Sequence, residues 1–168
     1  MMVTPNRLSQ GLFLLLSLVG VGIALYLTSV HYEHVPLLCS TGGVVNCERV
    51  TSSPYSVVPG TTIPITVPGL GWAGISALLA IGILRLPAYV KQLVVAEFIW
   101  SLLALLFVLY LVYVEIVLLH TLCAWCTGLH VVILIMFFIA LFQLFSFGVQ
   151  EQDEDEEETV LTTATKRE

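Results

Sequence analysis

Four cysteines, arranged in two pairs, are the residues of this chain best suited to chemistry. Cys39 and Cys47 lie in a polar stretch, with seven residues between them that include two glycines. Cys123 and Cys126 form the sequence Cys-Ala-Trp-Cys. A Cys-x-x-Cys pair is a typical redox dithiol, and a second pair gives it a partner for thiol–disulfide exchange. The sequence therefore predicts an oxidoreductase in which electrons pass from one pair to the other.

The spacing of Cys123 and Cys126 corresponds to one helical turn at the start of an apolar segment. A thiol in the first turn is close to the helix N-terminus, which favours the thiolate. Cys126 is expected about 4.5 Å deeper along the axis, given the rise per residue. One sulfur can then face the polar loop while the other faces the apolar interior. This arrangement suits a relay between a protein thiol and a lipid-soluble electron acceptor.

The elements that must position these cysteines are predicted to be membrane-spanning helices. Hydrophobic residues make up 58% of the 168-residue chain and charged residues 11%, and the mean hydropathy is +0.97. A helix needs about 20 apolar residues to cross a bilayer. We predict an all-α integral membrane protein, a four-transmembrane-helix bundle in residues 1–150 with an external cysteine-bearing loop at 31–66. The four spans are expected at about residues 11–30, 67–84, 93–114 and 122–147.

Several features near these spans are predicted in more detail. The third and fourth spans have no glycine or proline between them, so the chain should reverse direction around residues 115–121. Residues 47–55 begin like a helical turn that Pro54 should end. Glu97 is expected to reach the membrane interface. Residues 151–168 are charged and threonine-rich without periodicity, so we expect a disordered, acidic, cytoplasmic tail.

The first apolar segment is interpreted as a retained span. Its core of 20 residues is too long for a signal peptide, and no Ala-x-Ala-like site follows it. The basic residues then predict the orientation. With both termini in the cytoplasm, Arg7, Arg85 and Lys91 lie inside and only Arg49 lies outside. Both cysteine pairs would face the exterior, where disulfides persist, and a cell membrane is favoured over the endoplasmic reticulum.

Simpler interpretations of the same residues remain open. The bond between Cys39 and Cys47 could be a structural staple, and the second pair could be inert in the bundle. A zinc site that uses His31 and His34 with the cysteines is disfavoured, because seven residues between Cys39 and Cys47 exceed the usual ligand spacing. We therefore expect no metal. No basic patch indicates nucleic acid.

His130 is a further candidate for the site. An ionisable side chain inside a span is costly unless it faces the bundle interior, which marks it as a functional candidate. On a helix, Cys123, Cys126 and His130 share one face. His130 could hydrogen-bond a quinone oxygen or supply its proton, and the alternative is a bond to a neighbouring helix.

These cysteines carry a resemblance to a known family. Residues 39 and 47, the run Cys-Glu-Arg-Val-Thr-Ser-Ser-Pro-Tyr-Ser at 47–56, and the Cys-x-x-Cys at 123–126 resemble vitamin K epoxide reductase and its prokaryotic homologues. The resemblance covers roughly residues 9–147. The bacterial quinone-linked disulfide oxidase has its Cys-x-x-Cys in the first external loop, so the reverse order here favours the epoxide reductase family.

The resemblance implies a role for each site residue. Cys39 would meet a partner thiol protein, and Cys47 would pass electrons to Cys123 through a transient disulfide. Cys126 would be the thiolate that reduces a quinone, whether menaquinone, ubiquinone or one of vitamin K type. Ser53 matches a family serine near the site. The four spans fill the 168 residues, so a thioredoxin-like partner is expected as a separate protein.

Two departures from the vertebrate enzymes concern the substrate. His130 stands where those enzymes have a tyrosine, and residues 68–72 offer no clear match for their asparagine before the second span. Both differences favour quinone reduction over epoxide reduction. The predicted function is thus reoxidation of a thioredoxin-like partner at the expense of a membrane quinone, in support of disulfide-bond formation. The alternatives are a vitamin K quinone or epoxide reductase and a non-enzymatic membrane scaffold with structural disulfides.

Overall fold

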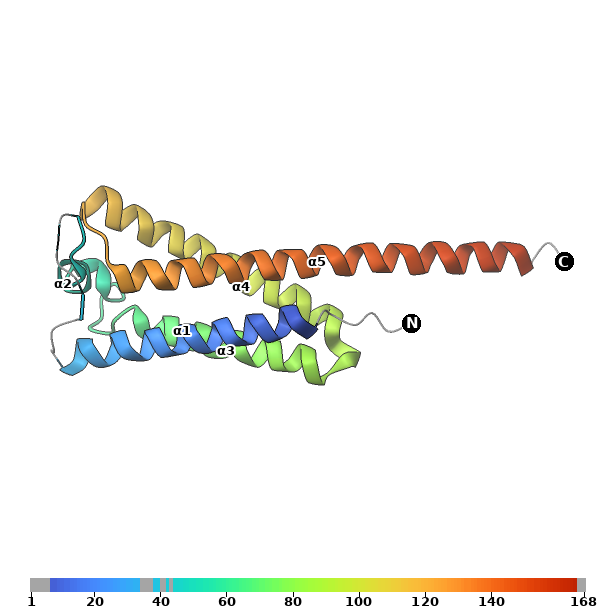
Figure 1. Ribbon diagram of the computed structural model, residues 1–168, viewed down its shortest axis with the longest axis horizontal. Helices are drawn as coiled ribbons and strands as arrows, with labels where there is room; N and C mark the ends of the chain where they lie inside the picture. Colours follow the sequence, from blue (N-terminus) through green and yellow to red (C-terminus); the bar gives the residue numbers. More distant parts are fainter. Residues whose placement is uncertain (1–6, 34–37, 40–41, 43, 166–168) are drawn as a thin grey trace.

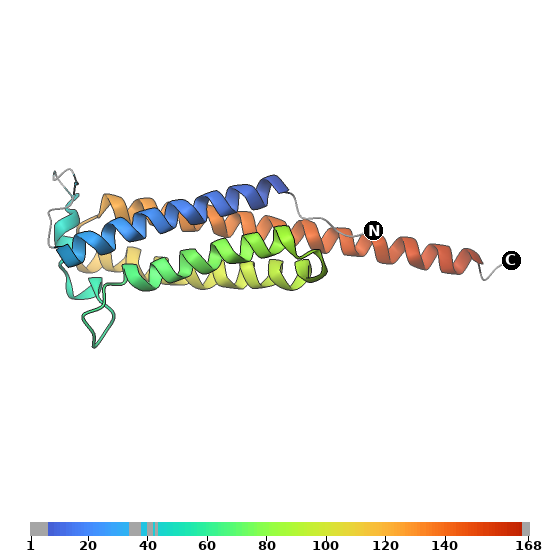
Figure 2. The same cartoon turned by 90° about the horizontal axis from the view of Figure 1, so that it is seen from below.

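A computed structural model shows a bundle of four long helices with a small cap of loops at one end (Figure 1). The structure describes residues 7–33, 38–39, 42 and 44–165, and side chains as far as residue 148. The long helices are α1 (Arg7–Glu33), α3 (Thr66–Arg85), α4 (Val90–Tyr113) and α5 (Ala124–Thr165). They run side by side in both views (Figures 1 and 2). The predicted all-α, four-span fold is confirmed.

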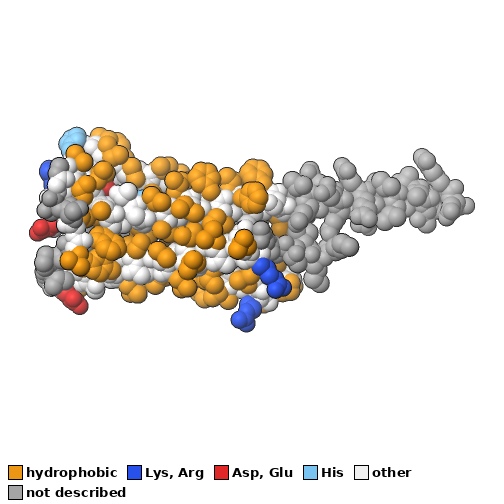
Figure 3. Space-filling view, in the orientation of Figure 1, with side chains coloured by type: hydrophobic (Ala, Val, Ile, Leu, Met, Phe, Trp, Pro, Cys, Tyr) orange, Lys and Arg blue, Asp and Glu red, His pale blue; other side chains and the backbone are white. Residues whose placement is uncertain are grey.

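The surface of the bundle is suited to lipid. All four helices contain stretches long and apolar enough to cross a membrane, and only 22–28% of each such stretch is buried inside the protein. Apolar side chains cover the visible side of the bundle, and the charged side chains seen there lie near its two ends (Figure 3). Because exposed apolar surface of this extent is costly in water, the chain is a multi-pass membrane protein.

Buried apolar side chains on all four spans build the interior of the bundle, and Val90 and Val94 of α4 cluster with Ile83 of α3. Phe13 of α1, Ala80 of α3, and Met136 and Ala140 of α5 form a buried cluster. Helices α1 and α3 approach closely at Gly20, where an added Cβ would lie 3.6 Å from the Cβ of Ala73. Small residues permit such close packing between membrane helices.

The reversal between the third and fourth spans falls where the sequence predicts it. A π-helical turn, η3 (Val114–Leu118), extends α4, and the chain then turns through residues 119–123. His120 adopts a left-handed backbone conformation, with φ of 50°. Histidine is one of the non-glycine residues that tolerate this conformation, so the turn forms without glycine or proline.

The cysteine-bearing loop contains two short helices. Helix α2 (Cys47–Thr51) begins at Asn46, whose side-chain oxygen accepts a hydrogen bond from the backbone nitrogen of Arg49 at 3.0 Å. The helical turn η1 (Pro54–Ser56) follows directly. The predicted helical turn after Cys47, ended near Pro54, is confirmed. A second 3₁₀ turn, η2 (Pro87–Tyr89), connects α3 to α4 at the opposite end.

Two expectations from the sequence differ from the structure. Glu97 does not reach the interface: its side chain is 1% exposed, inside the bundle. The backbone of residues 151–165 is the helical end of α5, which extends beyond the bundle (Figure 1), where the sequence predicts disorder. This segment has no glycine or proline and is rich in glutamate, a good helix former, so it can continue a helix that has already begun. Residues 166–168 lie outside the described residues.

Candidate functional site

Cys39 and Cys47 form a disulfide that links the loop to the start of α2. Their Cα atoms lie 6.2 Å apart. Cys39 is partly exposed, whereas Cys47 is completely buried. Of the two cysteines in this disulfide, Cys39 is therefore the one that lies at the surface of the loop.

The backbone places Cys47 next to Cys123. Val45 and Leu122 form a parallel β-bridge. In this bridge the nitrogen of Leu122 donates to the carbonyl of Val44 at 2.9 Å, and the nitrogen of Asn46 donates to the carbonyl of Leu122 at 3.0 Å. Asn46 immediately precedes Cys47, and Leu122 immediately precedes Cys123, so the hydrogen bond between Asn46 and Leu122 brings the two cysteines together. Both cysteines are completely buried. The two cysteine pairs, distant in sequence, thus meet beneath the loop.

Trp125, near the start of α5, binds the part of the loop that leads into Cys39. Its indole nitrogen donates to the carbonyl of Leu38 at 2.9 Å, and its ring lies 4.9 Å from that of Tyr26, between centroids. Leu38 immediately precedes Cys39. The indole of the Cys-Ala-Trp-Cys motif therefore fixes the chain beside the outer disulfide.

Cys123 and Cys126 are free thiols in the structure, one helical turn apart at the start of α5. The backbone nitrogen of Cys126 donates to the Sγ of Cys123 at 3.2 Å. Hydrogen bonds from the Cys126 side chain, and further ones from the backbone of Cys126 and Trp125, lower the pKa of the Cys123 thiol below its usual value, against burial and the charge of Glu115. Cys123 is thereby prepared to act as a thiolate.

The pKa of Cys123 can be measured from the absorbance of its thiolate at 240 nm as the pH is raised. We expect this thiolate to form at a pH below the ordinary cysteine pKa of about 8.5. Because its pKa is lowered, Cys123 keeps its thiolate until the pH falls through that lowered value, and its nucleophilic attack should slow there. The Cys39–Cys47 disulfide does not titrate, so the signal comes from the inner pair. Cys126→Ala removes the largest stabilising bond and should move the transition upward. A native transition at or above about 8.5 would contradict this assignment.

Glu115 is part of the site although the sequence pattern did not identify it as such. Its side chain is 4% exposed, and its Oε2 atom accepts a hydrogen bond from the backbone nitrogen of Cys123 at 3.3 Å. The π-helical turn η3 brings it over the start of α5. The available signal was a single carboxylate within an otherwise apolar run before the Cys-x-x-Cys motif.

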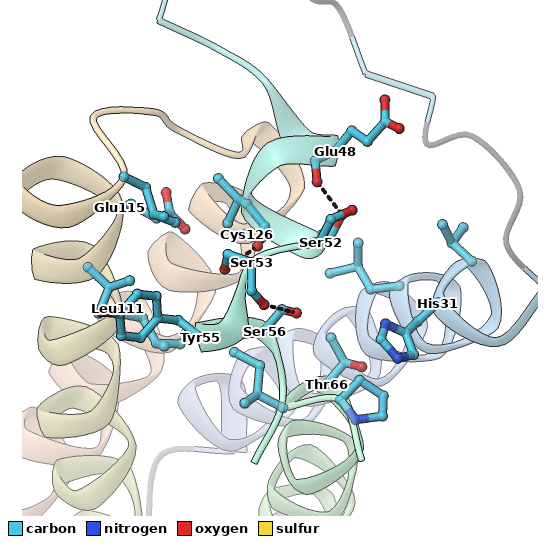
Figure 4. A pocket seen from close by; sticks show the side chains of 18 of the residues that line it. His31, Glu48, Ser52, Ser53, Tyr55, Ser56, Thr66, Leu111, Glu115 and Cys126 are labelled. Atoms are coloured by element: carbon cyan, nitrogen blue, oxygen red, sulfur yellow. Dashed lines mark hydrogen bonds between the residues drawn. The ribbon is translucent and has the colours of Figure 1, made fainter. Parts of the chain in front are cut away.

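Two cavities meet at Cys126. The first, the loop cavity, has a volume of about 620 Å³ and lies between the loop and the ends of α1, α4 and α5; Ser53, Glu115 and Cys126 line it together (Figure 4). The second, the bundle cavity, has a volume of about 310 Å³ and lies between the helices, lined largely by apolar side chains. Both are lined by Leu27, Ile65, Thr66, Leu111, Cys126 and His130.

The bundle cavity has an aromatic wall and a lipid-facing side. The indole nitrogens of Trp72 on α3 and Trp100 on α4 each donate to the other residue's carbonyl at 3.3 Å, which joins the two helices beside the cavity. Leu103 and Phe107 of α4 also line it and are 55% and 48% exposed on the outer surface. A lipid-soluble molecule can approach the cavity from this side.

His130 and Ser53 lie where the sequence analysis expected them, at the same site as the cysteines. His130 is one turn along α5 from Cys126, is 8% exposed and lines both cavities. Ser53 is 9% exposed and lines the loop cavity. Its hydroxyl donates to the carbonyl of Val50 at 2.7 Å, a bond that supports the turn after α2.

The zinc site considered from the sequence has no matching cluster of ligands in the described part of the chain. Among those residues, no three His, Cys, Asp or Glu side chains are grouped as metal ligands. His34, one of the two histidines of the disfavoured zinc hypothesis, lies outside the described residues.

Comparison with protein families gives a match over most of the chain. The model of the vitamin K epoxide reductase family matches residues 12–141, which include all four cysteines, Ser53, Glu115 and His130. No curated protein matches the chain significantly.

Proposed function

The chain belongs to the vitamin K epoxide reductase family, and from this premise we propose that it is a thiol–disulfide oxidoreductase that passes electrons from a thioredoxin-like protein to a membrane quinone. Family membership implies a membrane redox activity. The observation that carries the finer proposal is the position of Cys126, which belongs to the inner cysteine pair and lines both the loop cavity and the bundle cavity.

Electrons enter at the outer pair. A thiolate of the reduced partner attacks the exposed sulfur, Cys39, and Cys47 leaves as a thiolate; a second partner thiol then releases Cys39 and the oxidised partner. Exposure of Cys39 and burial of Cys47 support this order of attack. We place the loop on the exterior of a cell membrane, because Arg7, Arg85 and Lys91 all lie at the opposite end.

Transfer to the inner pair follows from the backbone pairing beneath the loop. The Cys47 thiolate attacks Cys123 of an inner Cys123–Cys126 disulfide, and Cys126 leaves as a thiolate. Cys39 then attacks Cys47, which restores the outer disulfide and releases Cys123. The result is an oxidised outer pair and a reduced inner pair, the arrangement of cysteines in this structure.

The residues around Cys126 fit a quinone. The bundle cavity offers apolar side chains for a prenyl tail, and His130 offers a polar group for a ring oxygen. A bound quinone would accept two electrons and two protons. Cys123 and Cys126 would supply the two electrons as their disulfide forms again, and the two protons lost by the partner's thiols would reach the quinone through water. His130 would hold a proton or a hydrogen bond at the quinone oxygen.

The test is quinone reduction by the purified full-length protein in nanodiscs, with a reduced thioredoxin-like protein as donor. We expect quinone-dependent oxidation of the donor by the native chain. A sample with its thiols blocked by N-ethylmaleimide is the control and should be inactive. A folded native protein that shows no turnover with menaquinone, ubiquinone or vitamin K quinone, and whose four cysteines are static, would refute the proposal and favour a disulfide-stapled scaffold.

His130→Leu should lower the rate of quinone reduction by about a hundredfold, the usual lower range for loss of a positioned acid or base. The rate at which the donor reduces the Cys39–Cys47 disulfide should stay unchanged, because His130 does not contact the outer pair. Stopped-flow absorbance of the quinone and mass spectrometry of alkylated thiols separate the two steps. His130→Gln, which keeps an N–H donor, should recover part of the rate. Equal losses in both steps would indicate a packing role instead.

A further inference from the structure

A second buried polar cluster lies at the end of the bundle opposite the cysteines. It joins Gln10 of α1, Glu97 of α4 and Gln143 of α5, which are 0%, 1% and 5% exposed. The amide nitrogen of Gln10 donates to Oε2 of Glu97 at 2.9 Å and also to Oε1 of Gln143. Neither the membrane fold nor the proposed redox relay requires a carboxylate at this place.

The two hydrogen bonds determine which atoms of the cluster stay unpaired. The amide nitrogen of Gln10 has two hydrogens and uses both, so the orientations of Gln10 and Gln143 are fixed by their partners. Three buried atoms of the cluster then have no hydrogen-bond partner: Oε1 of Gln10, Oε1 of Glu97 and Nε2 of Gln143. The hydroxyl of Ser101 is also buried and unpartnered, one helical turn from Glu97 on the same face of α4.

An ionised carboxylate in this position is costly unless a positive charge lies beside it. Its hydrogen-bond partner in the cluster is a neutral amide, and an uncompensated buried charge costs several kcal/mol. Buried charges in proteins are paired or coordinate metal ions. The three unpaired oxygen atoms, from a carboxylate, an amide and a hydroxyl, are of the kind that hard cations prefer as ligands.

We propose that Glu97, Gln10 and Ser101 bind one monovalent metal cation of the sodium class. The single carboxylate balances a single positive charge, and the described residues hold no group of three acidic, His or Cys side chains of the kind that would favour a multivalent metal. The N–H of Gln143 binds a water molecule that completes the coordination of the ion. The bound cation links α1, α4 and α5 at this end and stabilises the bundle. This site is independent of the redox relay.

The experiment measures thermal unfolding of the full-length protein in nanodiscs, in sodium chloride and in choline chloride of equal ionic strength, at pH 8. We expect the melting temperature to rise with sodium concentration and then to saturate, as linkage requires for a ligand of the folded state. Binding of ²²Na⁺ to the same sample should saturate at one ion per chain. Glu97→Gln keeps the size of the side chain and should abolish both effects.

Two further variants keep the test decisive if Glu97→Gln does not fold. Ser101→Ala removes one ligand with little change in shape and should weaken sodium binding by about tenfold, the usual effect of one bond to a charged group. Glu33→Gln alters an exposed carboxylate at the other end of α1 and should behave as the native chain. A folded native protein that binds no ²²Na⁺, or whose melting temperature depends on pH but not on sodium, would overturn the proposal.

Discussion

Replacement of Cys126 by serine should lower quinone reduction by at least about a thousandfold, as expected when a residue that forms the covalent intermediate is removed. Without the Cys126 sulfur, the inner pair cannot form the disulfide that releases two electrons together. The reduced Cys47 cannot take its place at the quinone, because Cys47 is completely buried and lines neither cavity. Serine retains nearly the same shape, so the loss would reflect chemistry rather than packing.

The measurement is steady-state quinone absorbance with the reduced donor in excess. Thr127→Ser provides the matched control, because Thr127 is the next residue on α5, is exposed and lines neither cavity; its rate should equal the native rate. A Cys126→Ser chain that is folded and still reduces quinone at a near-native rate would be incompatible with the relay. It would be compatible with a scaffold in which only the Cys39–Cys47 disulfide matters.

The sequence was sufficient to predict the four spans, and it placed the candidate site residues close enough in the chain to be grouped without the structure. The four long helices could be predicted from the apolar runs in the sequence. In a membrane such a run forms a helix, because its backbone N–H and C=O groups must then be hydrogen-bonded within the segment itself. Cys126 and His130 could be placed on one face because they lie within one helix, where spacing alone determines direction. The sequence left the disulfide pairing open, because four cysteines allow three pairings; the bond between Cys39 and Cys47 is seen only in the structure.

Features that depend on contacts between distant segments could not be predicted in this way. The hydrogen bond from Cys123 to Glu115 depends on the π-helical turn η3, which has no simple sequence signature. The parallel bridge between Val45 and Leu122 joins segments more than seventy residues apart. Glu97 was expected at the interface because it lies near the predicted cytoplasmic end of its helix, and its burial was missed because its amide partner, Gln10, is on another helix.

The bridge between Val45 and Leu122 allows a direct test of how electrons pass between the two cysteine pairs. In a chain with Cys39→Ser and Cys126→Ser, only Cys47 and Cys123 remain, and mild oxidation should convert nearly all molecules to the Cys47–Cys123 disulfide. The Leu122 bonds to Val44 and Asn46 hold the two backbones together immediately before these residues. Both side chains are buried under the loop, and the lowered pKa of Cys123 favours its attack on an oxidised Cys47. Mass spectrometry of the proteolysed, unreduced protein would detect the linked peptides.

The matched control leaves Cys47 with the other inner thiol, in a chain with Cys39→Ser and Cys123→Ser. Cys126 lies a full turn farther along α5 and lines the cavities, whereas a disulfide requires Cα atoms within about 7 Å and converging side chains. Its yield should be at most roughly a tenth of that from the first pair. If Cys47 cross-links to Cys126 as well as it does to Cys123, the loop is not held by the Val45–Leu122 bridge. The structure would then give no reason for electrons to pass through Cys123 rather than directly to Cys126. If only the first pair forms, the transient disulfide of the relay has been captured at the position from which Cys126 is released toward the quinone cavity.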